Sequence, residues 1–203
     1  MQQYQKAWNK MADDFTIFRW RAGHGKRQGE AMKVLGIDPG TATTGYGLIR
    51  SEAGRVKAIT YGTIVTPAQL EMPLRLYQIY RELQALLMEY KPDAVAVEEI
   101  FYNRNSKTVI TVAQSRGVIL MTAAAAGIPV AEYTPLQVKQ AVVGYGAAEK
   151  KQVQLMVQKI LGLQQLPRPD DAADALAVAI CHLHSYRLSS FLESSATKAG
   201  EKR

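Results

Sequence analysis

The stretch MKVLGIDPGTATTGYGLIR, residues 32–50, decides the fold of this chain. Its first half is a short apolar run, 33–38, suited to a buried β-strand that ends at Asp38 in the turn sequence Asp-Pro-Gly. A Gly- and Thr-rich segment follows and leads into a second strand pattern. A lone carboxylate at the end of a buried strand can cap a turn, contact a nucleotide phosphate or hold a metal ion. The rest of the sequence has to distinguish these three roles.

The segments after this stretch predict an α/β domain. Strands over 45–52 and 56–65 would complete a three-stranded antiparallel meander, and apolar residues at three- and four-residue steps predict a helix over 71–90. The other expected elements are a strand over 94–99, a helix to about 126, a strand over 129–133, and three further helices that begin near 134, 147 and 167. We therefore expect one domain over 32–187, with a mixed five-stranded sheet and helices on both faces.

The two ends of the chain differ from this middle part. Residues 1–31 show no sustained period, and we interpret them as a disordered extension or a mis-assigned start, although their aromatic residues could form a small docking patch. Residues 188–203 are predicted to be a flexible polar tail. The net charge of +7 lies mostly in these ends, because 32–184 hold fifteen basic against thirteen acidic residues. A polyanion would therefore have to bind a local basic patch.

The composition also limits the cellular compartments in which the protein is expected. The chain of 203 residues has a single cysteine, Cys181, which cannot build a disulfide framework and so favours a reducing compartment. No apolar run approaches the roughly 18 residues that a membrane span needs, and the N-terminus lacks the layout of a signal peptide. The sequence predicts a cytoplasmic protein without membrane contact.

Acidic residues lie at the ends of two predicted strands and at the start of a predicted helix. Asp38 follows the first strand, and the pair Glu98-Glu99 closes the strand over 94–99; alternation lets only one of the pair face the same side as Asp38. Asp171 and Asp174 are three residues apart and share a helical face, and the small residues of AADALAVAI would let that helix lie close to the sheet. Taken singly, these acids are ordinary turn, strand-edge and helix-start residues.

Gathered together, the same carboxylates would indicate a metal site. At roughly 4 Å and an effective dielectric near 20, each pair of carboxylates repels by about 4 kcal/mol, which no stable fold builds without compensation. Oxygen-only ligands select hard ions such as Mg²⁺ or Mn²⁺, and two such ions can clamp a phosphodiester during hydrolysis. The three histidines fall outside any zinc-ligand spacing.

Five motifs together resemble the RuvC family of Holliday-junction resolvases, from Met32 to about Ser185. They are GIDPGTATTGYG, VAVEEIFYNRNSKT, AQSRGV, VKQAVVGYGAAEKKQVQ and DDAADALAVAI. The resemblance implies a ribonuclease-H-like fold and a homodimer that makes paired symmetric nicks across four-way junction DNA in recombination and repair. It also implies two Mg²⁺ ions per active site, with Mn²⁺ as a substitute, and cooperation with the RuvA–RuvB branch-migration complex.

Carried over residue by residue, the resemblance implies a catalytic and metal-binding set made of Asp38, Glu98, Asp171 and Asp174, and so selects Glu98 over Glu99. Phe101 would stack on an unpaired base, unless it is simply a core residue. Lys139 and Lys150 would contact phosphates, although a lysine is by default a solvated surface residue. The neighbours expected to extend this basic surface are Arg104, Lys107, Arg116 and Lys151. Gly117, inside the long helix, suggests a tight helix crossing, and in this family that helix belongs to the dimer interface.

Two other classes of function are considered. IDPGT also resembles the first phosphate loop of actin-like and sugar-kinase ATP-binding domains, but these need a second domain of similar size and give the paired helical aspartates no role. A non-catalytic junction-binding scaffold would not need the four acids. Nicking of a four-way junction in Mg²⁺ would separate the nuclease from both alternatives.

Overall fold

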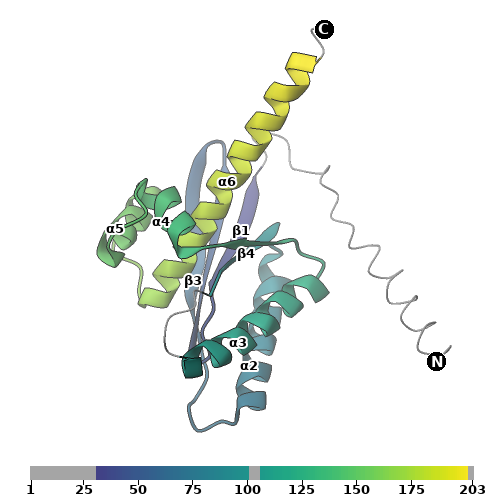
Figure 1. Cartoon of the computed structure of the whole chain (residues 1–203), viewed down its shortest axis with the longest axis vertical. Coiled ribbons are helices and arrows are strands. Elements are labelled where there is room, and N and C mark those ends of the chain that lie inside the picture. The colour runs from purple at the N-terminus through teal and green to yellow at the C-terminus, as the bar shows by residue number, and fades with distance from the viewer. Residues whose placement is uncertain (1–30, 101–105, 201–203) are drawn as a thin grey trace, which may run out of the picture.

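The computed structural model describes residues 31–100 and 106–200. The elements are β1 (Met32–Asp38), β2 (Thr43–Glu52), β3 (Arg55–Val65), α2 (Met72–Tyr90), β4 (Ala94–Glu98), α3 (Ser106–Ala125), β5 (Val130–Tyr133), α4 (Pro135–Val143), α5 (Lys150–Leu161) and α6 (Asp170–Gly200). They form one sheet in the order β3-β2-β1-β4-β5, in which β1 pairs antiparallel with β2 and parallel with β4 (Figure 1). The predicted mixed five-stranded sheet is confirmed.

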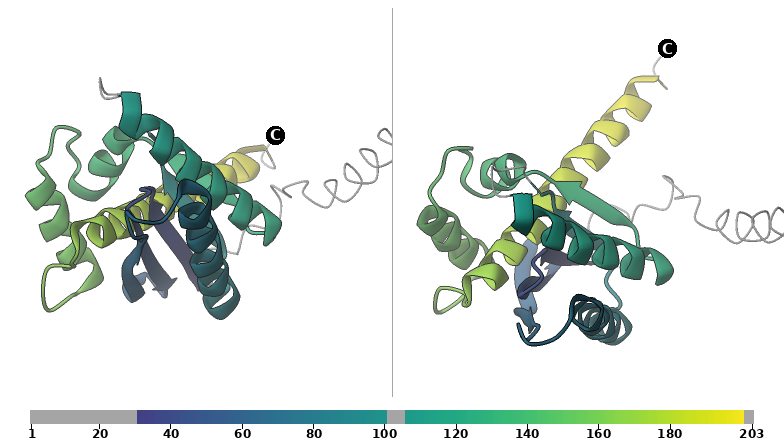
Figure 2. Two further views of the ribbon diagram at one scale, coloured as in Figure 1. Left: turned by 90° about the horizontal axis from the view of Figure 1, so that it is seen from below. Right: turned by 60° about the horizontal axis from the view of Figure 1, so that its bottom comes forward.

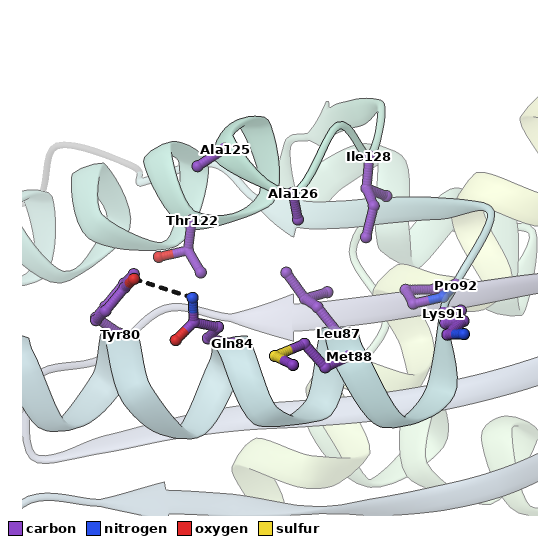
Figure 3. Close-up of a pocket in the computed structure, with 10 residues that line it drawn as sticks. All are labelled: Tyr80, Gln84, Leu87, Met88, Lys91, Pro92, Thr122, Ala125, Ala126 and Ile128. Atoms are coloured by element: carbon purple, nitrogen blue, oxygen red, sulfur yellow. Dashed lines mark hydrogen bonds between the residues drawn. The ribbon is translucent and has the colours of Figure 1, made fainter.

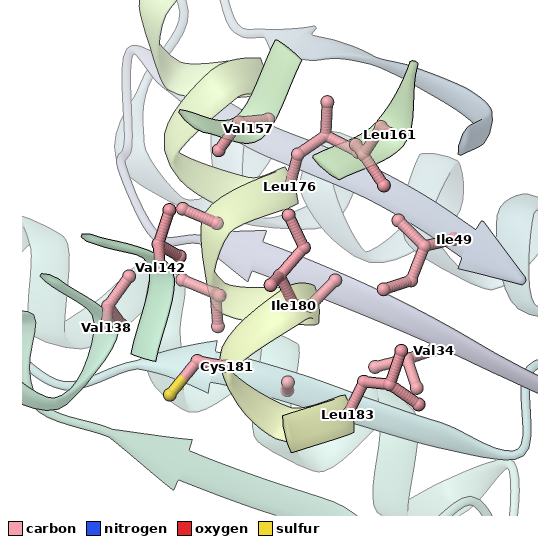
Figure 4. Close-up of a cluster of buried hydrophobic side chains, with 14 of the residues drawn as sticks. Val34, Ile49, Val138, Val142, Val157, Leu161, Leu176, Ile180, Cys181 and Leu183 are labelled. Atoms are coloured by element: carbon pink, nitrogen blue, oxygen red, sulfur yellow. The ribbon is translucent and has the colours of Figure 1, made fainter. Parts of the chain in front are cut away.

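Helices cover both faces of this sheet, as the two further views show (Figure 2). On one face α6 crosses the strands with α4 and α5 beside it, and their apolar side chains form one core cluster with β1 and β2 (Figure 4). On the other face α2 and α3 pack against each other and enclose a second cluster. The α2–α3 contact leaves a cavity of about 380 Å³ near the C-terminal ends of both helices, beside the hydrogen bond from Gln84 to Tyr80 (Figure 3).

Close contact between α6 and the sheet depends on glycine in the strands. Gly36 of β1 pairs with Gly47 of β2, and both lie under α6. A Cβ atom at Gly36 would stand 2.0 Å from the carbonyl oxygen of Ala175 and 2.7 Å from the amide nitrogen of Ala179. The α6 backbone therefore rests directly on the sheet, which confirms the prediction from the small residues of this helix.

The ends of the helices follow their capping residues, with one exception. Thr134 and Gln137 form a capping box that begins α4, and Gly144 ends that helix in the left-handed conformation. Gly162 ends α5 in the same way. The helix α6 includes most of the polar tail predicted over 188–203 and continues to Gly200, since no glycine or proline interrupts it before that point. None of the helices in residues 31–100 and 106–200 has the length and apolar character needed to cross a bilayer.

Candidate active site

Asp38 and Glu98 lie side by side because their strands are parallel neighbours in register. Val34 of β1 and Ala96 of β4 both belong to the core under α6. Since side chains alternate along a strand, Asp38 and Glu98 point to that same face, and Glu99 belongs to the opposite one. The choice that alternation alone left open therefore falls on Glu98, whose carboxyl is hydrogen-bonded to Asp38.

The start of α6 brings the two aspartates to this pair. Gly45 is the partner of Asp38 across the β1–β2 ladder, and a Cβ atom there would stand 2.0 Å from the carbonyl oxygen of Asp171. The first turn of α6 therefore lies on β2 directly beside Asp38. One turn further on, Asp174 is close enough for its charge to act on both Asp38 and Glu98. The four acids predicted from the sequence come together at the carboxyl ends of β1 and β4.

The closeness of these acids raises the pKa values of Asp38 and Glu98. Burial, followed by the charges of Glu98, Asp174 and Asp171, raises the pKa of Asp38 to about 8. Burial and the charge of Asp174 raise the pKa of Glu98 to about 6, against the opposing effect of its hydrogen bond to Asp38. Both raised pKa values favour a proton held between Asp38 and Glu98, which would relieve the repulsion between them.

Two lysines face the acids from the neighbouring helices. The Lys150 ammonium at the start of α5 lies 2.9 Å from Asp174 Oδ2 and 3.4 Å from Asp170 Oδ2. Burial raises the pKa of Asp174, and Lys150 counters that rise. Lys139 of α4 and Lys150 line a cavity of about 240 Å³ together with Glu98 and Asp174. Two cations and two acids therefore line one cavity.

The other residues predicted to contact DNA differ in their surroundings. Arg116 of α3 is paired with Glu132 of β5 and is only partly exposed. Lys151 follows Lys150 on α5 and is exposed. Phe101 and Arg104 lie outside the described residues, as does the side chain of Lys107.

Sequence reasoning missed a group of threonines that holds the loop after Asp38. The Thr41 hydroxyl donates to the carbonyl oxygen of Thr111 in α3 at 2.6 Å, and the Thr66 hydroxyl donates to the carbonyl oxygen of Thr41. Arg75 of α2 donates its Nε–H to the Thr66 hydroxyl at 2.8 Å. These bonds tie the loop to both helices of the opposite face and so fix the end of β1. Only the threonine-rich composition of 41–44 hinted at this role in the sequence.

The chemistry of the acids fits hard divalent cations, because every donor is a carboxylate oxygen. Within 31–100 and 106–200, however, no three His, Cys, Asp or Glu side chains are already arranged as a cage around an ion. The ammonium of Lys150 forms an ion pair with Asp174 beside this cluster. Binding a metal would therefore replace the Lys150 contact and the shared Asp38–Glu98 proton.

The raised pKa of Asp38 makes the stability of the metal-free protein depend on pH. Between the ordinary value of 3.8 and about 8, native Asp38 keeps a proton that the unfolded chain releases, so the free energy of unfolding falls as pH rises. We expect the fall to be larger in the wild type than in Asp38→Asn by at least about 2 kcal/mol. Urea unfolding in EDTA at both ends of this pH window measures the difference. Parallel pH profiles for the two proteins would contradict the crowding of Asp38.

The fold and the site define a class of protein: a ribonuclease-H-like α/β domain with an acidic cluster where two parallel strands end beside a helix start. The model of the family described as crossover junction endodeoxyribonuclease RuvC matches residues 34–182, and the chain belongs to that family.

Individual relatives agree with this assignment. The crossover junction endodeoxyribonuclease RuvC of Desulfitobacterium hafniense is 57% identical over 157 residues, which cover 77% of this chain and 95% of the relative. The structure of Thermus thermophilus RuvC is similar with a TM-score of 0.73 at 38% identity, covering 78% of this chain and 98% of that one. A structure of T. thermophilus RuvC in complex with Holliday junction substrate gives a TM-score of 0.75, with coverage of 78% and 97%.

Proposed function

We propose that this chain is a crossover junction endodeoxyribonuclease that resolves Holliday junctions by paired symmetric nicks in DNA recombination and repair. The observation that carries the proposal is the convergence of four acids from β1, β4 and α6, faced by two lysines. Relatives more than half identical over most of the chain bear the same enzyme name, and a related RuvC has been captured with Holliday junction substrate.

The acids would hold a pair of Mg²⁺ ions, for which Mn²⁺ could substitute. The charges of Glu98, Asp174 and Asp171 all act on Asp38, so Asp38 would contribute to holding both ions, and Glu98, Asp171 and Asp174 would supply the other carboxylates. When bound, the ions would lower the pKa of the attacking water and stabilise the departing oxygen of the phosphodiester. Breaking the bond between phosphorus and the O3′ atom would leave a 5′-phosphate and a 3′-hydroxyl, which a ligase can join.

The chain's own residues would bind and orient the scissile strand. Lys139 and Lys150 line the same cavity as Glu98 and Asp174, so a DNA phosphate that entered it would meet positive charge beside the acids. Lys150 is bound to Asp174 in the free protein, and contact with a phosphate would draw it away and release that carboxylate. Arg104, Lys107, Arg116, Lys151 and the stacking residue Phe101 are proposed to extend the DNA surface.

A direct test is incubation with a synthetic four-way junction and Mg²⁺, next to a linear duplex of the same sequence. We expect nicks at symmetric positions in two strands of the junction and none in the duplex. ATP turnover would instead favour the alternative of an actin-like or sugar-kinase ATP-binding domain. Junction binding without cleavage would favour a scaffold.

Removal of the two lysines should weaken binding through phosphate contacts. Each of Lys139→Ala and Lys150→Ala is expected to lower junction affinity and to reduce the slope of log affinity against log salt by about 0.9. The matched control is Arg81→Ala, which removes an exposed cation from α2 on the opposite face of the sheet. Electrophoretic binding at several salt concentrations gives the slopes, and slopes equal to that of the wild type would contradict phosphate contact.

The active enzyme is proposed to be a homodimer that uses the outer face of α3. Ile110 and Met121 are 63% and 57% exposed there, and Ala113 and Gly117 lie between them at helical spacing. A Cβ atom at Gly117 would meet no atom of the described residues within 4 Å, so the tight crossing suggested by this glycine would have to involve another molecule. A two-fold pair of such helices would present two active sites to the two strands of a symmetric junction.

Gly117→Glu is expected to separate the dimer, because a charged side chain would enter the closest part of the helix pair. Sedimentation velocity should show a shift from dimer to monomer, with loss of paired nicking. The matched control is Ala85→Glu, which also replaces a small residue by glutamate but at an exposed position of α2. A Gly117→Glu variant that stays dimeric would place the interface elsewhere.

Two further properties follow from the proposed function. Movement of the junction before cleavage implies cooperation with the RuvA–RuvB branch-migration complex. We also propose that the enzyme works in the cytoplasm, a proposal supported by its action on chromosomal DNA and by the single thiol of Cys181.

A further inference from the structure

A second concave surface lies well away from the acids. It is a cavity of about 710 Å³ between the start of β3, the C-terminal end of α5 and the middle of α6. Along α6, Arg187 is thirteen residues beyond Asp174, which at 1.5 Å per residue is about 20 Å from the candidate active site. We call this surface the β3–α5 groove.

The rim of the β3–α5 groove is positively charged. Arg55 and Lys57 come from β3, Lys159 from the last turn of α5 and Arg187 from α6, and none of the described residues that line the groove is acidic. The Arg187 guanidinium donates to the Ser51 hydroxyl at 2.6 Å, which holds this cation in place. Lys159 and Arg187 lie on the side of the apolar residues Val56 and Ala58, whereas Arg55 and Lys57 alternate with these two along β3 and point to the other side of the strand. Cations on both sides of this strand edge favour an anionic ligand.

The wall between these cations is apolar. Val56 and Ala58 of β3 and Ile160 and Leu163 at the end of α5 line the groove, and all four are partly buried at the margin of the core under α6. A DNA duplex presents phosphates on a convex, fully hydrated backbone and gains nothing from an apolar wall. A ligand that carries both carboxylates and apolar side chains would satisfy the two parts of the groove together.

The backbone along the groove suits an extended chain. β3 is the last strand of the sheet, so alternate residues of 55–58 direct their N–H and C=O groups away from β2. An added strand would pair with these groups and place alternate side chains on the apolar wall and toward the cations. The same cations discourage pairing between two copies of this edge and favour a partner strand of opposite charge.

We propose that the β3–α5 groove is a docking site for a protein partner, and that it binds an extended acidic segment with alternating apolar side chains. The site is separate from the nuclease site, so a partner could bind there while the acids hold DNA. Its occupation would recruit or position the enzyme without entering the catalytic cavity.

The test uses a fluorescein-labelled peptide of about ten residues that alternates Glu and Val, with the full chain as receptor. Fluorescence anisotropy should show saturable binding, weakened about tenfold by Lys57→Glu and by Lys159→Glu. The matched control is Arg81→Glu, the same change of charge at an exposed position of α2, which should bind as the wild type does. A peptide that alternates Glu and Ser should bind at least about fivefold more weakly, because it leaves the apolar wall uncovered.

Several results would overturn the proposal. Equal affinity of Lys57→Glu, Lys159→Glu and Arg81→Glu would show that the peptide binds elsewhere. Equal affinity of the Glu–Val and Glu–Ser peptides would exclude use of the apolar wall. Displacement of the peptide by a short DNA duplex, together with loss of duplex binding in both groove variants, would identify the groove as a nucleic-acid contact. Circular dichroism of each variant shows whether a loss of binding reflects a loss of folding.

Discussion

Asp38→Asn is expected to reduce junction nicking by at least about a thousandfold while leaving junction affinity within a few-fold of the wild type. The amide keeps the shape of the carboxyl but carries no negative charge for a metal ion. Asp38 stands among all three other acids, and their charges together with its burial raise its pKa to about 8. Removing its carboxylate therefore takes away the group placed to serve both ions, and also relieves repulsion, so the variant should fold at least as well as the wild type.

The matched control for this prediction is Glu99→Gln. Glu99 is the neighbour of Glu98 in sequence, but strand alternation puts it on the other face of the sheet. Single-turnover nicking under saturating protein separates chemistry from binding, and gel-shift assays in Ca²⁺ or EDTA give the affinity. Normal nicking by Asp38→Asn would remove the metal-site assignment, and equal losses in both variants would point to a general effect of charge.

The sequence predicted the strands and the acids at their ends well because each signal is local. An apolar run that ends in Asp38, and another that ends in Glu98, can be read without knowing the partner strand. The choice between Glu98 and Glu99 could not be made from the strand pattern alone. Side chains alternate between the two faces of the sheet, but the pattern does not say which face α6 covers. That choice needed the tertiary contacts of Ala96 and Val34.

Contacts between elements that are far apart in the sequence could not be predicted from local sequence patterns. The ion pair of Lys150 with Asp174 joins the starts of α5 and α6, whose relative position depends on the packing of both helices against the sheet. The pairing of Arg116 with Glu132 likewise joins α3 to β5. The β3–α5 groove has cations from three separate elements, and none of them forms a cluster in the sequence.

Gly36→Ala is expected to cost about 3 kcal/mol or more of the free energy of unfolding, although alanine is otherwise favoured over glycine. The new Cβ atom would stand 2.0 Å from the carbonyl oxygen of Ala175, and a helix backbone cannot move aside as a flexible side chain can. The conflict lifts α6 from β1, and α6 also carries Asp171 and Asp174, so nicking should fall in the fraction that still folds.

Gly62→Ala is the matched control, because the atoms nearest to its Cβ would belong to the phenol end of the Tyr46 side chain and not to a backbone. We expect this change to alter the free energy of unfolding by less than about 1 kcal/mol. Urea titrations followed by circular dichroism give both values. A Gly36→Ala protein as stable as Gly62→Ala would mean that α6 does not rest on the sheet as closely as described, and the convergence of its aspartates with Asp38 would lose its structural basis.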